Sequence, residues 1–392
     1  MPAMRALVLA NDFPTSEAPY AGIFVLRQIQ ALLERGIDVR VISVVPHAPP
    51  LGAKWRSYRR IPQRYEVDGI PVEILRAFVP PRMYGINMVA RQLAEPLGSL
   101  VDEFRPDVVH VHTVVPAASY AAMLRVPTVV TAHGSDAYRH PWRRSDLKNA
   151  AVASLRCATS VVCVSEFIRN QVRRLGRTDA VVVYNGADEA IFKPKDRSAA
   201  RRSLGLPPDR PIVAFAGKIA EAKGVFELIE AARRLGDLHP TVVFAGTGPD
   251  SEKLQAAAAG LDARFPGALS HEALAGVFCA ADVVALPSYY EGLPAVLCEA
   301  MCCGRAIVAS GVGGIPEIVR DDETGKIVKP RDVEALGTAL RLVLTDAAKR
   351  ERFEREALAF ATDWLTWRHN AAAYEDIYLS SIRAWNRRVA AS

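Results

Sequence analysis

The chain has 392 residues, of which 50% are hydrophobic and 23% are charged. This length exceeds one ordinary hydrophobic core, so two domains are expected. No run of eighteen apolar residues occurs and the first apolar stretch is too short for a signal peptide, which predicts a cytoplasmic protein, with peripheral contact at the inner face of the plasma membrane left open. Six cysteines without Cys-x-x-Cys spacing or His-rich neighbours argue against zinc sites and disulfide frameworks.

The formal charge of +6 is unevenly distributed. Residues 1–195 contain 25 Lys and Arg against 17 Asp and Glu, whereas the remainder contains 24 against 26. The basic excess gathers in three clusters: Lys54-Trp55-Arg56 with Arg59-Arg60, Trp142-Arg143-Arg144, and Arg169 with Arg173-Arg174. Such clusters can contact anionic lipid or a phosphorylated partner, although solvated helix faces explain the same count. No nucleic-acid-binding motif accompanies the charge, which argues against a nucleic-acid partner.

Short runs rich in Val, Ile and Leu alternate with amphipathic helical stretches in the first half of the chain. The runs are Arg5–Ala10, Val39–Val45, Asp107–Thr113, Pro127–Ala132, Ser160–Val164 and Ala180–Tyr184. Continuous apolar runs of this kind are typical of strands that are buried on both faces of a parallel sheet. The pattern predicts a first α/β domain over residues 1–192.

Residues 193–211 are polar and rich in proline, which predicts a linker that includes a short helix over Ser198–Leu204. A second domain over 212–371 follows, because apolar runs recur at Ile212–Ala216, Thr241–Ala245, Asp282–Leu286, Ala306–Ala309 and Lys326–Val328. Helical sequence then extends from Val333 to Arg388, and the end of the chain, about 372–392, is expected to pack back on the first domain.

The fold class that these elements predict is α/β, with two tandem Rossmann-like, doubly wound domains. Sheets of this type bind ligands outside the carboxyl ends of their strands. We therefore expect the two domains to face each other across a cleft that holds the functional site.

The segment Pro287–Ala300 follows a predicted strand and begins a helix with Pro294 near its first position, where the fixed φ of proline suits a helix start. Free N–H groups and the helix dipole favour a phosphate group at that end. Glu291 stands before the helix and Glu299 about a turn and a half into it. The two carboxylates can therefore bind hydroxyl groups on different parts of one elongated ligand. Two surface carboxylates are the alternative, which the apolar neighbours of Glu299 disfavour.

Two lysines, Lys218 and Lys223, follow the first strand of the second domain. Two cations at the carboxyl end of a strand can clamp a diphosphate and stabilise the negative charge that develops on a leaving group. A pair of solvated surface lysines is the alternative interpretation. No Asp-x-Asp motif for a metal ion is present in the sequence.

Four further positions lie where predicted strands end. His133 ends an apolar strand, although a histidine at a strand end is more often structural than functional. Asp136 either positions an acceptor or caps a helix. Gly22, after the first strand, would let the backbone approach a phosphate closely. Asn185 closes the last strand of the first domain, where a turn is an adequate alternative explanation.

The spacing of Glu291 and Glu299 within Pro-Ser-x-x-Glu-Gly-x-Pro resembles that of retaining glycosyltransferases of family 4, which have the GT-B fold. The resemblance covers nearly the whole chain and extends to Gly22, Thr131–Asp136, Val183–Asp188, Gly217-Lys218, Lys223-Gly224, Gly246–Pro249 and Gly313–Glu317. Within the family, Gly22–Val25 with Gln28, and Ile61-Pro62 with Asp68–Val72, look like enzymes of teichuronic-acid and exopolysaccharide biosynthesis.

By this resemblance, Glu299 binds the ribose hydroxyls of a sugar nucleotide and Glu291 the hydroxyls of the donor sugar. His133 lies against the same sugar, with its carbonyl near the anomeric carbon. Asn185 borders the donor site. The backbone beneath the diphosphate comes from Gly292, Leu293, Pro294 and Ala295.

The chain departs from the family's pattern at two places. Lys218 stands where the family usually has arginine, which replaces a rigid bidentate fork by a point charge. Ala21 precedes Gly22 where the family usually has two glycines, which leaves less room in that loop.

The function implied by the resemblance is metal-independent, retaining transfer of a sugar from a nucleoside-diphosphate sugar to an acceptor hydroxyl, with no cofactor beyond the donor. His133, Glu291 and Lys223 are the expected catalytic residues, and the expected acceptor is a lipid-linked glycan of cell-surface polysaccharide synthesis. A hydrolysing sugar-nucleotide epimerase is an alternative that would need acid/base carboxylates of which the sequence shows no set. A non-catalytic sugar-nucleotide-binding protein is another, although it would be expected to lose His133 or Glu291.

Overall fold

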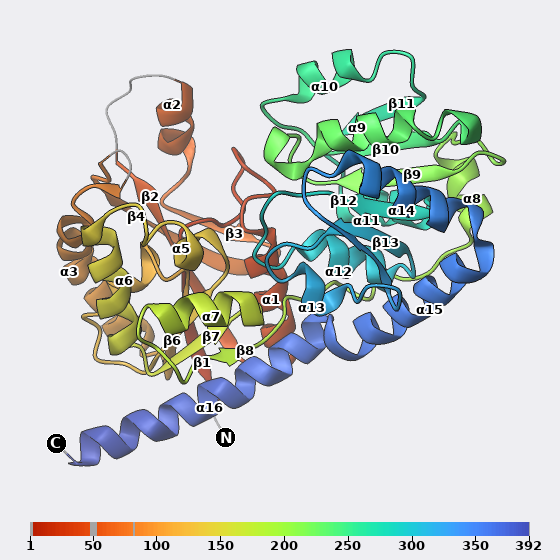
Figure 1. Cartoon of the computed structure of the whole chain (residues 1–392). Helices are drawn as coiled ribbons and strands as arrows, with labels where there is room; N and C mark the ends of the chain where they lie inside the picture. Colours follow the sequence, from red (N-terminus) through yellow and green to blue (C-terminus); the bar gives the residue numbers. More distant parts are fainter. Residues whose placement is uncertain (1–2, 48–52, 81–82, 392) are drawn as a thin grey trace. The chain divides into compact units, whose positions relative to one another are not determined.

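The computed structural model describes residues 3–47, 53–80 and 83–391. The chain forms two compact units, one of residues 1–184 with 370–392 and the other of residues 185–369 (Figure 1). The boundary falls after Tyr184, whereas the sequence predicts it after residue 192. The end of the chain belongs to the first unit, from Asn370 onward.

The first unit is built on an eight-stranded sheet. In spatial order the strands are β3 (Arg64–Val67), β4 (Ile70–Ala77), β2 (Asp38–Pro46), β1 (Arg5–Ala10), β5 (Val108–His112), β6 (Thr128–Ala132), β7 (Ser160–Cys163) and β8 (Val181–Val182). All neighbours are parallel except β3 and β4. The six predicted strands are present, but β3 and β4 were not predicted. β3 is a partly exposed edge strand, and β4 pairs with it. Both strands mix apolar with polar residues, so neither forms a continuous apolar run.

Strand order in this sheet reverses between β1 and β5, which makes the carboxyl ends of these two strands its switch point. The helices of this unit are α1 (Ile23–Glu34), α2 (Ala53–Arg60), α3 (Ile86–Phe104), α4 (Ala117–Ala121), α5 (Ser135–Tyr138), α6 (Ser145–Cys157), α7 (Glu166–Arg174) and most of α16 (Trp367–Ala391). The loop that follows β1 and the residues that follow β5 therefore lie where doubly wound sheets bind their ligands.

The C-terminal helix α16 packs on the first unit through a buried polar face. This face consists of Asn370, Tyr374, Tyr378 and Ser381. The hydroxyl of Tyr374 lies 2.7 Å from Oγ1 of Thr131 in β6, and the hydroxyl of Tyr378 lies 2.7 Å from Nδ1 of His110 in β5. Because each bond needs one particular pair of atoms, the contacts define the position of the helix along the sheet.

The second unit contains a six-stranded parallel sheet. Its spatial order is β11 (Ala263–Gly267), β10 (Thr241–Ala245), β9 (Ile212–Ala216), β12 (Val283–Leu286), β13 (Ala306–Ser310) and β14 (Gly325–Val328). Five strands lie close to their predicted bounds. The edge strand β11 was not predicted, because its residues are alternately exposed and half-buried instead of uniformly apolar.

Strand order in the second sheet reverses between β9 and β12. The helices around it are α8 (Arg197–Ser203), α9 (Val225–Arg233), α10 (Ser251–Ala257), α11 (His271–Ala280), α12 (Ala295–Cys302), α13 (Ile315–Ile318), α14 (Val333–Thr345) and α15 (Ala347–Trp364). Along the described residues, no helix has both the length and the apolar character needed to cross a membrane.

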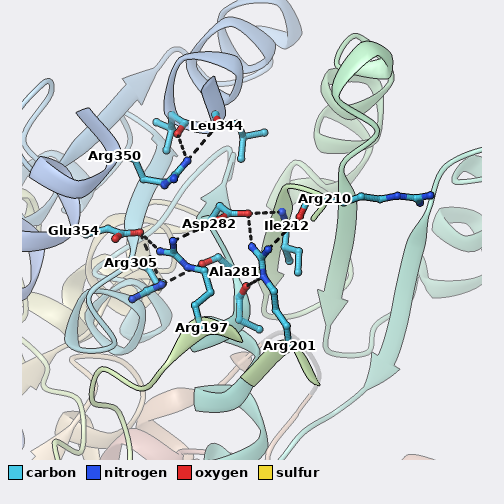
Figure 2. A network of polar contacts seen from close by, with 12 residues as sticks. Arg197, Arg201, Arg210, Ile212, Ala281, Asp282, Arg305, Leu344, Arg350 and Glu354 are labelled. Atoms are coloured by element: carbon cyan, nitrogen blue, oxygen red, sulfur yellow. Dashed lines mark hydrogen bonds and ion pairs between the residues drawn. The ribbon is translucent and has the colours of Figure 1, made fainter. Parts of the chain in front are cut away.

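The segment 193–211, which the sequence predicts as a linker, is an integral part of the second unit. It contains α8, which packs on α11, and the side chain of Arg201 in α8 is buried. Nη2 of Arg201 lies 2.6 Å from Oδ2 of Asp282, and the same oxygen accepts a 2.7 Å hydrogen bond from the backbone N–H of Ile212 (Figure 2). A buried ion pair therefore binds this polar segment to the sheet.

The same polar network reaches the helix α15 (Figure 2). The guanidinium of Arg197 in α8 is ion-paired with the carboxylate of Glu354 in α15 and lies 3.6 Å from Asp282. Nη1 of Arg305 is 3.9 Å from Glu354, and burial lowers the pKa of Arg305. Because these charges are partly or fully buried, each depends on its ion-pair and hydrogen-bond partners to offset the cost of its desolvation.

We predict that Asp282→Ala lowers the free energy of unfolding by about 3–5 kcal/mol, because it leaves the Arg201 guanidinium buried without its carboxylate. Urea unfolding measures this change. The matched control is Asp237→Ala, which breaks the exposed pair with Arg341 and should shift the unfolding midpoint far less. Equal shifts in the two variants would show that the buried network does not stabilise the unit.

Candidate active site

At the switch point of the second sheet, the loop after β9 (217–224) lies against the loop after β12 (287–294). Gly224 has a φ of +70°, and a Cβ atom there would lie 2.0 Å from the carbonyl oxygen of Pro287. Only glycine has both the conformational freedom and the small size for this position. The contact brings the predicted lysine loop and the predicted glutamate loop together.

The ammonium of Lys223 and the carboxylate of Glu291 form an ion pair across these loops. Nζ of Lys223 lies 2.6 Å from Oε1 of Glu291, and the two side chains are 28% and 10% exposed. The two groups predicted to bind a ligand are therefore each other's partner. The low exposure strengthens their attraction relative to a surface pair. The pair presents a cation for a phosphate and a carboxylate for hydroxyl groups at one place.

The helix α12 begins directly after Glu291. Pro294 has ψ 112° and occupies the cap position, so the first helical residue is Ala295, one position later than the sequence predicts. Leu293 is buried and anchors the turn, whereas Glu299 is half-buried in the second turn of the helix. The predicted order of carboxylate, turn and helix start is thus present, and the N–H groups of the first turn lie at the carboxyl end of β12.

The loop after β13 supports the backbone of the glutamate loop. Gly313 has a φ of +58°, and a Cβ atom there would lie 2.0 Å from the carbonyl oxygen of Glu291. The N–H of Gly314 donates a 2.7 Å hydrogen bond to the carbonyl oxygen of Gly292. The position of Glu291 is therefore held by backbone contacts on both sides of its loop.

Lys218 lies at the start of the loop after β9. Its side chain is exposed. A Cβ atom on Gly246, which follows β10, would lie 1.9 Å from the carbonyl oxygen of Gly217, so these two loops also touch. Lys218 and Lys223 thus occupy one loop, but only Lys223 is drawn into the ion pair with Glu291.

In the first unit, His133 directly follows β6, and its ring contacts two other rings. Nε2 of His133 lies 2.9 Å from Nδ1 of His112, the last residue of β5, and the ring of Phe24 in α1 is 4.8 Å away. Burial lowers the pKa of His133 to about 3. The imidazole is therefore neutral at pH 7, and it acts through hydrogen bonds and not as a cation.

Asp136 is buried beside His133 and binds backbone N–H groups. Its buried carboxylate accepts hydrogen bonds from the backbone N–H groups of Val114 at 2.8 Å, Gly134 at 2.6 Å and His133 at 3.2 Å. Burial raises the pKa of Asp136, and these bonds act in the opposite direction. The carboxylate thus joins the segments that follow β5 and β6. It does not cap α5, whose cap residue Gly134 has no side-chain cap hydrogen bond, and contact with an acceptor stays a prediction.

Gly22 and Asn185 lie in tightly packed backbone. Gly22 has a φ of +62°, and a Cβ atom there would lie 2.0 Å from the carbonyl oxygen of Asp12. Asn185 is buried, and on the next residue, Gly186, a Cβ atom would lie 2.3 Å from the backbone nitrogen of Trp367. Close backbone packing is therefore a sufficient reason for glycine at positions 22 and 186, independently of any ligand.

Two groups near these positions were not predicted. His110 and His112 share one face of β5, and their alternation with valine in an otherwise apolar run is the signal that could have revealed them. Tyr289 donates a 2.5 Å hydrogen bond to Glu227, and the guanidinium of Arg331 lies 4.3 Å above its ring. Burial and the Glu227 carboxylate raise the pKa of Tyr289 to about 12.

Two of the basic clusters meet in one surface of the first unit. The centre of the Trp142 ring lies 4.9 Å from Nζ of Lys148 and 4.6 Å from the guanidinium of Arg174, and the guanidinium of Arg144 lies 3.8 Å from the centre of the Tyr84 ring. We call these five residues the Trp142 surface. In the third predicted cluster, the side chains of Lys54, Trp55 and Arg56 lie outside the described part of the structure.

Comparison with known proteins identifies the two halves of the chain. Residues 21–190 match the family model Glycosyltransferase Family 4, and residues 196–359 match the model Glycosyl transferases group 1. A glycogen synthase of Mycobacterium tuberculosis is 34% identical to this chain, over 97% of the chain and 95% of its own length. TuaC of Bacillus subtilis, named as a teichuronic acid biosynthesis glycosyltransferase, is 29% identical over 86% of the chain and 88% of its own length.

The fold has close relatives among solved structures. Anabaena HepE in complex with UDP-glucose superposes with a TM-score of 0.74 and 20% identity, over 96% of this chain and 100% of its own. The likeness spans both units, each with its parallel sheet. The chain therefore belongs to the glycosyltransferases with the GT-B fold.

Proposed function

We propose that this glycosyltransferase moves a sugar from a nucleoside-diphosphate sugar to an acceptor hydroxyl, with retention of anomeric configuration and without a metal ion or other cofactor. The observation that carries this proposal is the Lys223–Glu291 ion pair beside the start of α12, at the switch point of the second sheet. An ammonium and a helix N-terminus can offset the charge of a diphosphate, as a metal ion does in other enzymes. The named relatives and the UDP-glucose complex of HepE support such a donor.

In the proposed step, the bond between the anomeric carbon and the diphosphate oxygen breaks, and a bond to the acceptor oxygen forms on the same face of the sugar. The acceptor's proton passes to the departing diphosphate, so a carboxylate nucleophile on the opposite face is not needed. The main requirement is stabilisation of the negative charge on the leaving group. Lys218, Lys223 and the N–H groups at the start of α12 supply it.

Donor recognition is assigned to the remaining site residues. Glu299, half-buried in α12, accepts hydrogen bonds from the ribose hydroxyls, and Glu291 accepts them from the donor sugar. His133, neutral because it is buried, hydrogen-bonds the sugar from the first unit. The ion pair with Glu291 orders the Lys223 side chain before the donor arrives. When the donor binds, its phosphate becomes a second anion beside this lysine.

We further propose that the acceptor is a lipid-linked glycan of cell-surface polysaccharide synthesis, used at an anionic membrane. The name of TuaC supports this acceptor, and the Trp142 surface supports the membrane contact, because indole rings flanked by cations suit the headgroup region of a bilayer. A soluble glucan is the second candidate acceptor, since the glycogen synthase is similar over almost the whole chain.

The reaction can be tested by nucleoside diphosphate release from a panel of UDP-, ADP- and GDP-sugars, with a membrane lipid extract or glycogen as acceptor. We expect release that depends on the acceptor and persists in EDTA, and a product with the donor's anomeric configuration by NMR. Glu291→Ala should abolish this release, whereas the exposed Glu323→Ala should not. An inverted product, a requirement for metal, or an epimerised free sugar would contradict the corresponding part of the proposal.

For Lys223→Met we expect a fall in kcat of about 10²–10³-fold at saturating donor, because the leaving group loses one of the two lysines proposed to stabilise it. The matched control is Lys349→Met, which removes a lysine paired with Asp322 at 3.1 Å elsewhere in the same unit. The control should keep the wild-type kcat. An unchanged kcat in Lys223→Met, with the variant folded by circular dichroism, would refute the role of this lysine.

Membrane contact predicts that the protein sediments with vesicles of phosphatidylglycerol and phosphatidylcholine but not with phosphatidylcholine alone, and that high salt releases it. Trp142→Ala combined with Arg174→Gln should weaken sedimentation, because the variant loses the indole and one of its flanking cations. Trp364→Ala changes another exposed tryptophan in the second unit and should leave sedimentation unchanged. Equal binding by both variants would argue against the Trp142 surface.

A further inference from the structure

Behind His133, the first unit contains two further buried histidines on the neighbouring strand. His110 has both ring nitrogens engaged, Nδ1 with the hydroxyl of Tyr378 at 2.7 Å and Nε2 with the hydroxyl of Thr131 at 2.8 Å. The His110 and His112 ring centroids are 4.2 Å apart. The ring of His112 is thus packed against a neighbour whose own orientation is held by two hydrogen bonds.

His112 and His133 are joined by a single hydrogen bond between Nδ1 of His112 and Nε2 of His133, 2.9 Å long. Burial lowers the pKa of both rings, so each is neutral and carries one N–H. One proton must lie between the two bonded nitrogens. Its location decides which nitrogen of each ring carries the other proton: if His112 donates, then His133 is protonated at Nδ1.

The two remaining nitrogens, Nε2 of His112 and Nδ1 of His133, are buried and make no hydrogen bond within the described part of the chain. A buried N–H without a partner is more costly than a buried lone pair. His112 lies deeper, with 2% exposure, whereas His133 is half-buried after the end of its strand. The unpaired N–H is therefore better placed on His133, the less buried of the two residues.

We propose that His112 is a positioning residue for His133: its Nδ1–H donates to Nε2 of His133, orients that ring, and leaves Nδ1–H of His133 to donate to an oxygen of the donor sugar. The inference rests on the proposed function, in which His133 lies against that sugar. A ring held in one tautomer needs no reorganisation when the ligand binds. Asp136 supports the same residue from its other side, because it accepts the backbone N–H of His133.

The proton positions can be measured without any substrate, by ¹⁵N NMR of protein labelled at histidine, with the His133 signals assigned from a His133→Gln variant. Protonated and bare ring nitrogens of a neutral imidazole have well-separated ¹⁵N shifts. We expect His133 protonated at Nδ1 and bare at Nε2. A His133 ring protonated at Nε2, or a mixture of both forms, would overturn the proposal.

Three variants test the consequence for activity. His112→Phe removes the donor, and we expect kcat to fall about 10- to 100-fold with a smaller change in KM for the donor, together with loss of the single tautomer. His112→Asn keeps an amide near the position of Nδ1 and should restore both. Ser381→Ala is the matched control from the same buried face of α16, because Ser381 bonds to Ser160 at 2.8 Å and to none of the histidines, and it should leave kcat and the His133 signals unchanged.

The outcomes separate this proposal from the proposed function. Wild-type kcat and an unchanged His133 spectrum in His112→Phe would overturn the positioning role. If His112→Phe does not fold, the wild-type spectrum and His112→Asn still decide the question. The role is supported if kcat and the wild-type tautomer are kept together or lost together in His112→Asn. A slow His112→Asn that keeps the wild-type tautomer contradicts the role. Absence of transfer from every donor by the wild type would instead defeat the proposed function, while the spectrum would still report the tautomer.

Discussion

The second unit depends on backbone-to-backbone contact between the loops that follow its central strands. At the switch point between β9 and β12, Gly224 contacts the carbonyl of Pro287, and Gly313 contacts the carbonyl of Glu291. A side chain at either glycine would force the loops apart, because the Cβ atom would lie 2.0 Å from an oxygen. This contact allows Lys223 to reach Glu291 and places the pair beside the start of α12.

Charge is distributed differently in the two units. In the second unit, the proposed ligand-binding lysine is ion-paired with Glu291, and ion pairs between arginines and acids join α8 and α15 to the sheet. Each of these charges has lost water and depends on its partner. In the first unit, His112 and His133 are neutral at pH 7, so their geometry is set by a hydrogen bond whose direction depends on the proton positions.

The helix α16 connects the chemistry of the first unit to the end of the chain. Tyr374 bonds to Thr131 in β6, the strand that His133 follows, and Tyr378 bonds to His110 in β5, the strand that ends at His112. A helix more than two hundred residues away in sequence thus contributes to the environment of the proposed donor-sugar contact, as the separations of 243 and 268 residues show. Burying the Tyr374 and Tyr378 hydroxyls without hydrogen-bond partners would cost free energy. Thr131 and His110 supply these partners, so the packing of α16 depends on them.

The sequence by itself determined the apolar strands of both sheets, because strands buried on both faces are continuous apolar runs, but it did not reveal β3, β4 or β11. It also located Glu291 and Glu299 about the start of α12, since a glycine-proline turn between a strand and a helix is a local pattern. Only the tertiary structure decided that Arg201 is buried, that Lys223 pairs with Glu291, that Asp136 binds backbone and that His112 bonds to His133. Each of these contacts depends on which atoms meet after folding. The polarity and spacing of residues within one segment do not predict such contacts.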